Sequence, residues 1–521
     1  MKNILLFLSL LVFPFSASAQ SQDFDMAMRK LNMATFMTNM FYVDSVDCGK
    51  LVENAINGML EKLDPHSQYS NAKETRRMNE SIEGSFEGIG VQFNMLEDTL
   101  LVIQTISKGP SEKVGILAGD RIVTVNDTAI AGVKMSREEI MSRLRGPKGT
   151  KVKLGIVRPG VSGLSYFTVV RDKIPLNTLD AAYMVTPEIG LIRFSSFGLT
   201  TLDEVLGALQ RLKNQGMTKL IIDLQQNGGG LLDVAAGITS QFIARGDTIV
   251  YTRGRNVPSK VFISNGGSGF QQGKVVVLID EYSASAAEIL TGAIQDQDRG
   301  LVVGRRSFGK GLVQQPVDLP DGSMIRLTVA RYYTPSGRCI QKPYTKGDKE
   351  SYSKDVINRY NNGELTNADS IHFPDSLKFT TRKLGRTVYG GGGIMPDYFI
   401  PLDTTRYTKY YRELSAKSLI INANLHHLDR NRKKLTKQWS DFAQFKAEYE
   451  IPDNLVESIF EEGEKQNIKP KDDEERANTI PVIKRIMKAL TARDLWDMSE
   501  YFAIIYEDDP MVLKAVELLN N

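Results

Sequence analysis

Two stretches of the chain combine an apolar strand, a turn of small residues and a helix, and they restrict the fold most. Leu220–Leu224 is largely apolar and leads through Asn227–Gly230 into a predicted helix. Lys274–Asp280 is a second such strand, and it leads into a predicted helix at Ser285–Gln295. Near-continuous apolar strands that alternate with helices are typical of parallel strands covered on both faces. Residues 166–403 are therefore predicted to form an α/β core.

The first residues have the pattern of an export signal. Lys2 gives a positive start, Ile4–Phe15 is largely apolar, and Ala17–Ala19 is a small-x-small cleavage motif. The apolar run is shorter than the roughly 20 residues that a membrane-spanning helix needs. Residues 1–19 are therefore predicted to be a signal peptide removed before Gln20, which implies an exported protein, most simply a periplasmic one.

The segments on either side of the core are predicted to be helical. Residues 20–82 carry apolar side chains mostly at helical spacing, and Pro65 ends the second helix of this segment. His66, which follows that proline, is predicted to be a turn or packing residue. Residues 404–521 are rich in Glu, Lys and Leu, which favours a separate C-terminal helical domain.

Residues 83–165 change to short strands, with one helix at Ser136–Leu144 and a later strand at Lys151–Val157. A small sheet closed by one helix of this size resembles a PDZ domain. Such a domain presents backbone N–H groups to a chain-terminal carboxylate and adds the peptide to a strand edge. In that resemblance the carboxylate-binding loop consists of Gly88, Ile89, Gly90 and Val91.

Composition excludes several classes of function. The formal charge is +3 with both signs mixed along the chain, so no nucleic-acid partner is indicated. The two cysteines, Cys48 and Cys339, provide no disulfide framework, and four histidines limit metal chemistry. No metal and no cofactor is expected.

The strand-to-helix turns are the predicted place of catalysis, because loops at the carboxyl ends of parallel strands collect active sites. A serine there can be a nucleophile or a helix cap, and Ser283 and Ser285 both qualify. Lys310 lies between two glycines before apolar residues, where burial would lower its pKa and yield a neutral amine base. If this segment is extended, Gln314 lies on the same face as Lys310 and could hold its amine.

In combination these motifs resemble the carboxyl-terminal processing peptidases, or tail-specific proteases, over about residues 30–400. The matching segments are Leu63–Ser67, the PDZ loop, Asp223–Gly230, Ser283–Glu288, Phe308–Gln314, Thr334–Arg338 and Gly391–Asp397. The resemblance implies a multidomain α/β protein with a crotonase-like core. It also implies Ser285 as nucleophile, Lys310 as general base and Gln314 as its partner, with the amides of Gly230 and Ala286 as the oxyanion hole. Two residues depart from the family pattern: Gln225 replaces an arginine, and Cys339 replaces a serine.

The expected function is an exported, ATP-independent serine endopeptidase that recognises the C-terminal ends of protein substrates. The expected partners are proteins or peptides with free C-termini, and the C-terminal helical domain is a candidate for adaptor binding or self-association. The alternatives are a catalytically silent PDZ-type adaptor on a protease fold and a hydrolase or acyl-transfer enzyme that acts on small molecules. The complete Ser285, Lys310 and Gln314 set argues against the first, and the PDZ domain argues against the second.

Overall fold

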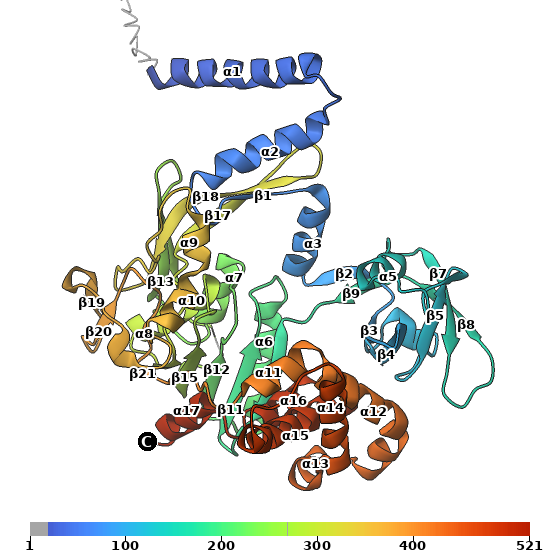
Figure 1. Cartoon of the computed structure of the whole chain (residues 1–521). Coiled ribbons are helices and arrows are strands. Elements are labelled where there is room, and N and C mark those ends of the chain that lie inside the picture. The colour runs from blue at the N-terminus through green and yellow to red at the C-terminus, as the bar shows by residue number, and fades with distance from the viewer. Residues whose placement is uncertain (1–18, 268) are drawn as a thin grey trace, which may run out of the picture.

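The computed structural model describes residues 19–267 and 269–521, so the predicted signal peptide lies outside it except for Ala19. At the centre lies a six-stranded sheet in the order β10-β11-β12-β15-β16-β21 (Figure 1). Its strands are parallel from β11 onward, and β10 is antiparallel. This arrangement confirms the predicted α/β core. The strands are β10 (Leu179–Met184), β11 (Ile189–Phe194), β12 (Lys219–Asp223), β15 (Lys274–Ile279), β16 (Leu301–Gly304) and β21 (Tyr398–Phe399).

Both faces of this sheet are covered, which explains why its strands are apolar throughout. Leu220 and Ile222 of β12 belong to the core under helices α6, α7 and α8. Ile221, between them, packs on the opposite face against α17, near the end of the chain. The predicted C-terminal domain is therefore not fully separate, because its last helix completes the protease core. These helices are α6 (Thr201–Asn214), α7 (Leu232–Thr239), α8 (Ala286–Asp296) and α17 (Pro510–Asn520).

A second, antiparallel sheet joins the N-terminal segment to the core. Its order is β1-β18-β13-β14, and β17 also pairs with β18. Tyr69 of β1 lies opposite Ile325 of β18, so a strand that the sequence did not indicate fixes the segment after the second helix. The strands are β1 (Gln68–Ser70), β13 (Thr248–Gly254), β14 (Lys260–Ile263), β17 (Leu312–Asp318) and β18 (Met324–Tyr333).

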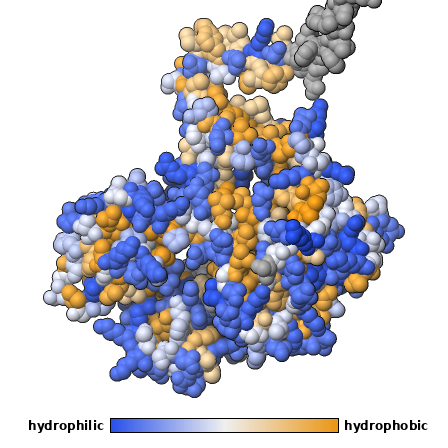
Figure 2. All heavy atoms as spheres, turned by 180° about the vertical axis from the view of Figure 1, so that it is seen from behind, coloured by the Kyte–Doolittle hydropathy of each residue, from blue (hydrophilic) through white to orange (hydrophobic). Residues whose placement is uncertain are grey.

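The N-terminal segment is helical, as predicted, with α1 (Ala19–Phe41), α2 (Cys48–Glu61) and α3 (Ala72–Glu83). Helix α3 begins with a capping box between Asn71 and Glu74. Helix α1 projects from the body (Figure 1), and apolar residues gather on its surface (Figure 2). Phe36 and Met40 are among its exposed side chains. Within the described ranges, no helix combines the length and apolar character that crossing a membrane requires.

The PDZ domain is present, and a two-stranded antiparallel ribbon of β2 and β9 connects it to the core. Its sheet has the order β3-β4-β5-β7-β8, and helix α5 begins after Ser136, whose side chain caps it. The sheet continues to Val170, beyond the end predicted at residue 165, because β8 pairs with residues Lys151–Ile156 of β7. The elements are β2 (Ser85–Gly88), β3 (Val91–Leu96), β4 (Thr99–Thr105), α4 (Pro110–Lys113), β5 (Arg121–Val125), β6 (Thr128–Ala129), α5 (Arg137–Leu144), β7 (Lys151–Val157), β8 (Ser165–Val170) and β9 (Asp172–Pro175).

The C-terminal helices lie below both the core and the PDZ domain in Figure 1. They share their own apolar core, to which Leu428, Ile459 and Met487 contribute. These helices are α11 (Lys409–Ala416), α12 (Leu419–Gln438), α13 (Phe442–Glu448), α14 (Asp453–Lys465), α15 (Asp473–Leu495) and α16 (Met498–Ile505). Between β18 and β21 the chain forms only short elements, namely α9 (Lys349–Ser353), α10 (Asp355–Asn361), η1 (Ala368–Ser370), η2 (Asp375–Leu377), β19 (Lys378–Thr380) and β20 (Thr387–Tyr389).

Candidate active site

Ser285 lies in the turn between β15 and α8, immediately before the first residue of the helix. Its φ of 57° falls in the left-handed region, which a residue with a side chain adopts rarely. Such strain persists only where the surroundings hold it, and it is common at catalytic turns. Ser285 is half-buried, whereas its neighbours Ala284 and Ala286 are buried.

One buried carboxylate holds the backbone on both sides of the site. Oε2 of Glu288, in the first turn of α8, accepts hydrogen bonds from the N–H groups of Ser285 and Lys310, each at 2.8 Å. Its Oε1 accepts from the Ser307 hydroxyl (2.5 Å) and the Gly309 N–H (2.7 Å). Burial raises the pKa of Glu288, whereas these donors act in the opposite direction. Glu288 thus fixes the segment that carries Lys310 against the turn that carries Ser285.

The side chain of Lys310 has the environment that a neutral amine base requires. Burial lowers the pKa of its amine, and the positive charge of Arg326 lowers it further. The hydroxyl group of Tyr332 donates to the backbone carbonyl oxygen of Lys310. The same hydroxyl group lies 3.1 Å from the backbone carbonyl oxygen of Ser285. Among the described residues, no hydrogen bond joins Lys310 Nζ to Ser285 Oγ. Catalytic hydrogen bonds are often long before substrate binds, so this geometry remains compatible with a dyad.

Gln314 lies beside the site, with its amide group bonded to other residues. Its Nε2 donates to the Thr328 hydroxyl and to the Leu312 carbonyl oxygen, both at 3.3 Å. The Thr328 hydroxyl in turn donates to Asp64 Oδ1 at 2.9 Å. The segment that ends the second helix therefore reaches the catalytic region through Asp64. The role of Gln314 as partner of Lys310 stays a prediction.

The alternative nucleophile, Ser283, is fully buried and its hydroxyl group is in use. It donates to the carbonyl oxygen of Leu224 at 2.8 Å and accepts from the N–H of Asp280 at 2.9 Å. Asp280 Oδ1 also accepts from the N–H of Gln226 at 3.0 Å. Ser283 and Asp280 thus join the turn that carries Ser285 to the glycine-rich loop, which is a structural role.

The glycine-rich loop lies directly against Ser285. A Cβ atom on Gly229, whose φ is +98°, would stand 2.7 Å from Ser285 Cβ and 2.9 Å from the Ala286 nitrogen. The Gly229 N–H donates to Asn227 Oδ1 at 2.9 Å, so it is not available to a substrate. The N–H groups of Gly230 and Ala286 have no acceptor among the described residues. This leaves them open for the predicted oxyanion hole.

His66 lies closer to the site than the sequence indicated. Its Nε2 is 2.9 Å from the hydroxyl oxygen of Tyr352, and the two rings meet edge to face. Burial lowers its pKa to about 4, and the positive charge of Lys310 contributes to that shift. The predicted packing role agrees with these contacts, and the proximity to Lys310 is new.

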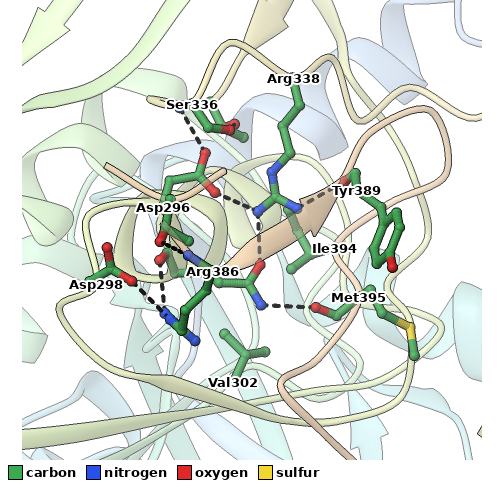
Figure 3. Close-up of polar contacts among 12 residues, drawn as sticks. Asp296, Asp298, Val302, Ser336, Arg338, Arg386, Tyr389, Ile394 and Met395 are labelled. Carbon is green, nitrogen blue, oxygen red and sulfur yellow. Dashed lines mark hydrogen bonds and ion pairs between the residues drawn. The ribbon is translucent and has the colours of Figure 1, made fainter. Parts of the chain in front are cut away.

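The far end of α8 is held by a polar network built from two of the matched motifs. Arg338, fully buried, donates to Asp296 Oδ1 at 2.7 Å and to Gln295 Oε1 at 2.8 Å (Figure 3). Arg386 bonds both Asp298 and Asp397 in the same network. Helix α8 is thus fixed at both ends, which keeps Ser285 in place.

The predicted PDZ loop joins β2 to β3. Gly88 ends β2, Val91 begins β3, and Gly90 between them has a φ of +72°. A Cβ atom on Gly90 would stand 3.0 Å from Ile174. Of the four loop residues, Ile89, Gly90 and Val91 line a cavity of about 440 Å³, whereas Gly88 does not. Their role in binding a carboxylate stays a prediction.

Glu288 and Tyr332 are the residues of this site to which the sequence argument gave no role. Glu288 follows a serine helix cap by three residues inside an apolar helix, a pattern that signals a buried acceptor. The contacts of Tyr332 depend on pairing across the second sheet, which no local pattern reveals. No group of His, Cys, Asp and Glu side chains among the described residues could hold a metal ion.

Comparisons with known proteins match four parts of the chain to known families. Residues 188–351 match Peptidase family S41, and residues 88–163 match the PDZ domain. Residues 14–75 match the activating protease CtpB N-terminal domain, and residues 410–497 match a family of unknown function.

Relatives of known name extend over most of the chain. The carboxy-terminal-processing protease of Bartonella bacilliformis is 39% identical over 305 residues, covering 58% of this chain and 69% of that protein. The carboxy-terminal processing protease CtpA of Bacillus subtilis is 34% identical over 362 residues, covering 67% and 75%. The solved photosystem II D1 C-terminal processing protease is 24% identical, with a TM-score of 0.37, and the match covers 74% of this chain and 95% of that one. The chain therefore belongs to the carboxy-terminal processing proteases of peptidase family S41 and is a serine endopeptidase with a PDZ domain.

Proposed function

We propose that this protein is an exported, ATP-independent endopeptidase that captures protein C-termini with its PDZ domain and cleaves them through an acyl-enzyme on Ser285. The observation that carries the proposal is the shared carboxylate of Glu288, which holds the backbone of Ser285 and Lys310 together. A buried lysine whose pKa is lowered, next to a strained serine, has the chemistry of a base and a nucleophile.

In the proposed reaction, Lys310 Nζ takes the proton of Ser285 Oγ while that oxygen attacks the peptide carbonyl carbon. The N–H groups of Gly230 and Ala286 would stabilise the oxyanion. Lys310 then gives the proton to the peptide nitrogen as the C–N bond breaks. The amine leaves, and the acyl group stays on Ser285 Oγ as an ester. A water molecule, deprotonated by Lys310, hydrolyses that ester and restores both residues.

Capture by the PDZ domain rests on its loop and on the free edge of β3. The loop would offer backbone N–H groups to the terminal carboxylate, and β3 would pair with the substrate tail. Gly90→Val should weaken cleavage of substrates with a free C-terminus, because valine at a positive φ is strained and contacts Ile174. Amidation of the substrate C-terminus should have the same effect. Unchanged cleavage in both experiments would show that the PDZ domain does not capture substrate C-termini.

Export rests on the pattern of residues 1–19, and the mature chain should begin at Gln20. N-terminal sequencing of protein from its native host tests this point. A chain that still begins at Met1 would reject export and the periplasmic location with it.

The test of the whole proposal is digestion of an unfolded protein by the intact chain and by Ser285→Ala. Peptides released only by the intact chain support a protease acting at Ser285. Equal activity of the two proteins would place the chemistry elsewhere, and the absence of cleavage by both would favour the adaptor function. An adaptor or a second copy bound by the C-terminal domain stays a proposal, to be tested by the mass of the chain in solution.

A further inference from the structure

The cavity at the PDZ loop is formed by two domains. On the PDZ side it is lined by β3 and by α5, including Met141 and Leu144. On the other side it is lined by Arg493 of α15 and Met498 of α16, which belong to the C-terminal helical domain. The groove that the PDZ fold offers to a peptide therefore has a second wall in this protein.

Strand β3 has an open edge beside that wall. It ends the sheet and pairs only with β4 among the described residues. Val91 and Phe93 pack toward the PDZ core, whereas the alternate residue Leu96 packs against Leu425 of α12. A peptide added to this edge would alternate in the same way, with one set of side chains facing α5 and the other facing the C-terminal domain.

Fixed contacts hold the second wall in place. Arg121 of the PDZ domain bonds Asp429 of α12 at 2.6 Å, and both side chains are largely buried. Leu101 and Ile103 of β4 pack with Leu425 in an apolar cluster beside this ion pair. The position of Arg493 relative to β3 is thus set by packing as well as by charge.

The groove is positively charged. Three arginines line it, and no aspartate or glutamate does so among the described residues. Arg145 is paired with Glu80 at 2.7 Å, and Arg137 lies over the ring of Phe93 at 5.1 Å. The lining residues with ionisable side chains are Arg137, Arg145 and Arg493.

Arg493 is the arginine placed for a side chain of the bound peptide. Its Nε donates to Asp494 Oδ1 at 2.8 Å, and a quarter of its side chain is exposed. Its two terminal nitrogens have no acceptor among the described residues. A guanidinium group held at one nitrogen and open at the other two matches a carboxylate.

Resting on the proposed capture of C-termini, we infer that the C-terminal helical domain reads the substrate tail, with Arg493 selecting an acidic side chain. The terminal side chain of the peptide faces Met141 and Leu144. The penultimate side chain, and the one two residues before it, then face Arg493 and Met498. The ligand is an extended protein C-terminus with Asp or Glu at one of these two positions.

The test measures binding of fluorescent peptides to the full chain carrying Ser285→Ala, so that no peptide is cleaved. Peptides carry Asp or Asn at the penultimate position, at the fourth position from the end, or at the third from the end, which faces α5. At low salt, Asp should bind about tenfold more tightly than Asn at one of the first two positions. If Asp and Asn peptides bind equally at both of these positions, the inference is overturned. This comparison needs no substitution in the groove.

Substitutions then assign the preference to one side chain. Arg493→Gln should reduce it to within about twofold. Arg493→Lys should keep only part of it, because lysine retains the charge but not the paired N–H donors. Arg412→Gln, at an exposed arginine of α11 in the same domain, is the matched control and should keep it fully. A preference that survives in Arg493→Gln, or is lost in Arg412→Gln, contradicts the role of Arg493.

The binding of free and amidated peptides distinguishes a failure of the proposed capture from a failure of the role of Arg493. If peptides with a free and an amidated C-terminus bind equally, the PDZ domain does not capture C-termini, whatever Arg493 does. If only the free C-terminus binds but Asp and Asn are equivalent, capture stands and the reading by Arg493 is wrong.

Discussion

The hydroxyl group of Tyr506, the residue that follows α16, donates a 2.5 Å hydrogen bond to Oδ2 of Asp223 at the carboxyl end of β12. Arg193 donates to the same oxygen at 2.6 Å and to the backbone carbonyl oxygen of Gln225 at 3.0 Å. The N–H of Gln225 donates to Asp223 Oδ1 at 2.9 Å. The C-terminal domain thus supports the first residues of the glycine-rich loop, at the place where Gln225 departs from the family pattern.

Tyr506→Phe should therefore lower both stability and catalysis. It removes the hydrogen bond to Asp223 and the one that Arg193 donates to the Tyr506 hydroxyl at 2.9 Å. A hydrogen bond to a charged group is worth about 1.5–3 kcal/mol of unfolding free energy. The glycine-rich loop would lose part of its support, so kcat should fall several-fold. Tyr501→Phe is the control, because the Tyr501 hydroxyl has no hydrogen bond among the described residues. Equal melting temperatures and equal kcat for the two variants would disprove the support role.

Gly229→Ala should inactivate the enzyme. The added Cβ would stand 2.7 Å from Ser285 Cβ and 2.8 Å from the Ala284 carbonyl oxygen, at a φ of +98°. The turn that carries Ser285 must shift, and shifts of about 1 Å at a reacting atom reduce rates by about 100-fold. The neighbouring Gly228 offers a matched control, since a Cβ there meets nothing within 4 Å. Measured kcat values should separate the two variants clearly; similar values would mean that the turn is not tightly packed.

The strands of the core were predictable because their composition reports burial on both faces. The place of Ser285 in a strand-to-helix turn was predictable as well, because the turn after such a strand is a local feature. Its role as nucleophile stays a prediction. The helix that covers the second face of the central sheet was not predictable. Helix α17 shows an apolar side at Met511, Val512 and Ala515, but nothing in that pattern names the sheet on which it packs.

Pairings between distant segments were missed for the same reason. The strand at Gln68–Ser70 is short, and only its pairing with β18, more than 250 residues later in the chain, makes it a strand. The contact of Glu288 with Ser307, Gly309 and Lys310 likewise joins separate segments. Local propensity cannot indicate such contacts, because tertiary packing decides them.

Glu288→Gln should disrupt the site although it preserves the shape of the side chain. Oε2 receives two backbone N–H groups and Oε1 receives one, so either orientation of the amide sets its NH₂ against a donor. An unsatisfied buried donor costs about 1–3 kcal/mol. The acylation rate of the folded variant should fall at least 100-fold, since Ser285 and Lys310 lose their common anchor.

Glu281→Gln is the matched control for Glu288→Gln. Glu281 is also buried, and its carboxylate pairs with Arg305 at 2.6 Å, away from Lys310. This variant should lose stability but keep most of its acylation rate per folded molecule. If the two variants lose activity in parallel, Glu288 acts only through stability.

His66 should make stability depend on pH between about 4 and 6.5. Its pKa is lowered to about 4 in the folded protein, against about 6.5 in an unfolded chain. The unfolded chain therefore binds more protons in this range, so stability falls as the pH falls. At pH 5 the loss from this residue is about 2 kcal/mol at most.

His66→Gln isolates that contribution, because glutamine can still bond the Tyr352 hydroxyl but does not titrate. The decrease in melting temperature from pH 7.5 to pH 5 should be smaller in this variant than in the intact chain. The same fall in both proteins would mean that His66 is protonated as easily when folded as when unfolded.

The rate of acylation should rise with pH as the Lys310 amine loses its proton, and the lowered pKa of Lys310 should set the midpoint of that rise. An unperturbed lysine has a pKa of about 10.4, so near pH 7 only about one amine in a few thousand is neutral. Burial and Arg326 lower the pKa of Lys310. Acylation should therefore rise with pH and level off well below pH 10. Arg326→Gln removes one of the two causes, so the midpoint of that rise should move to higher pH.

Substitution of Lys310 itself distinguishes a base from a fixed charge. Lys310→Arg keeps the positive charge but cannot lose its proton, so its acylation rate should fall to that of Lys310→Ala. The measurement is the rate at which purified, folded variants react with an active-site serine reagent between pH 6 and 10. Because both variants keep the backbone N–H that donates to Glu288, the position of Ser285 should be retained. Near-normal acylation by the arginine variant would show that Lys310 serves only as a charge, and the dyad mechanism would then be wrong.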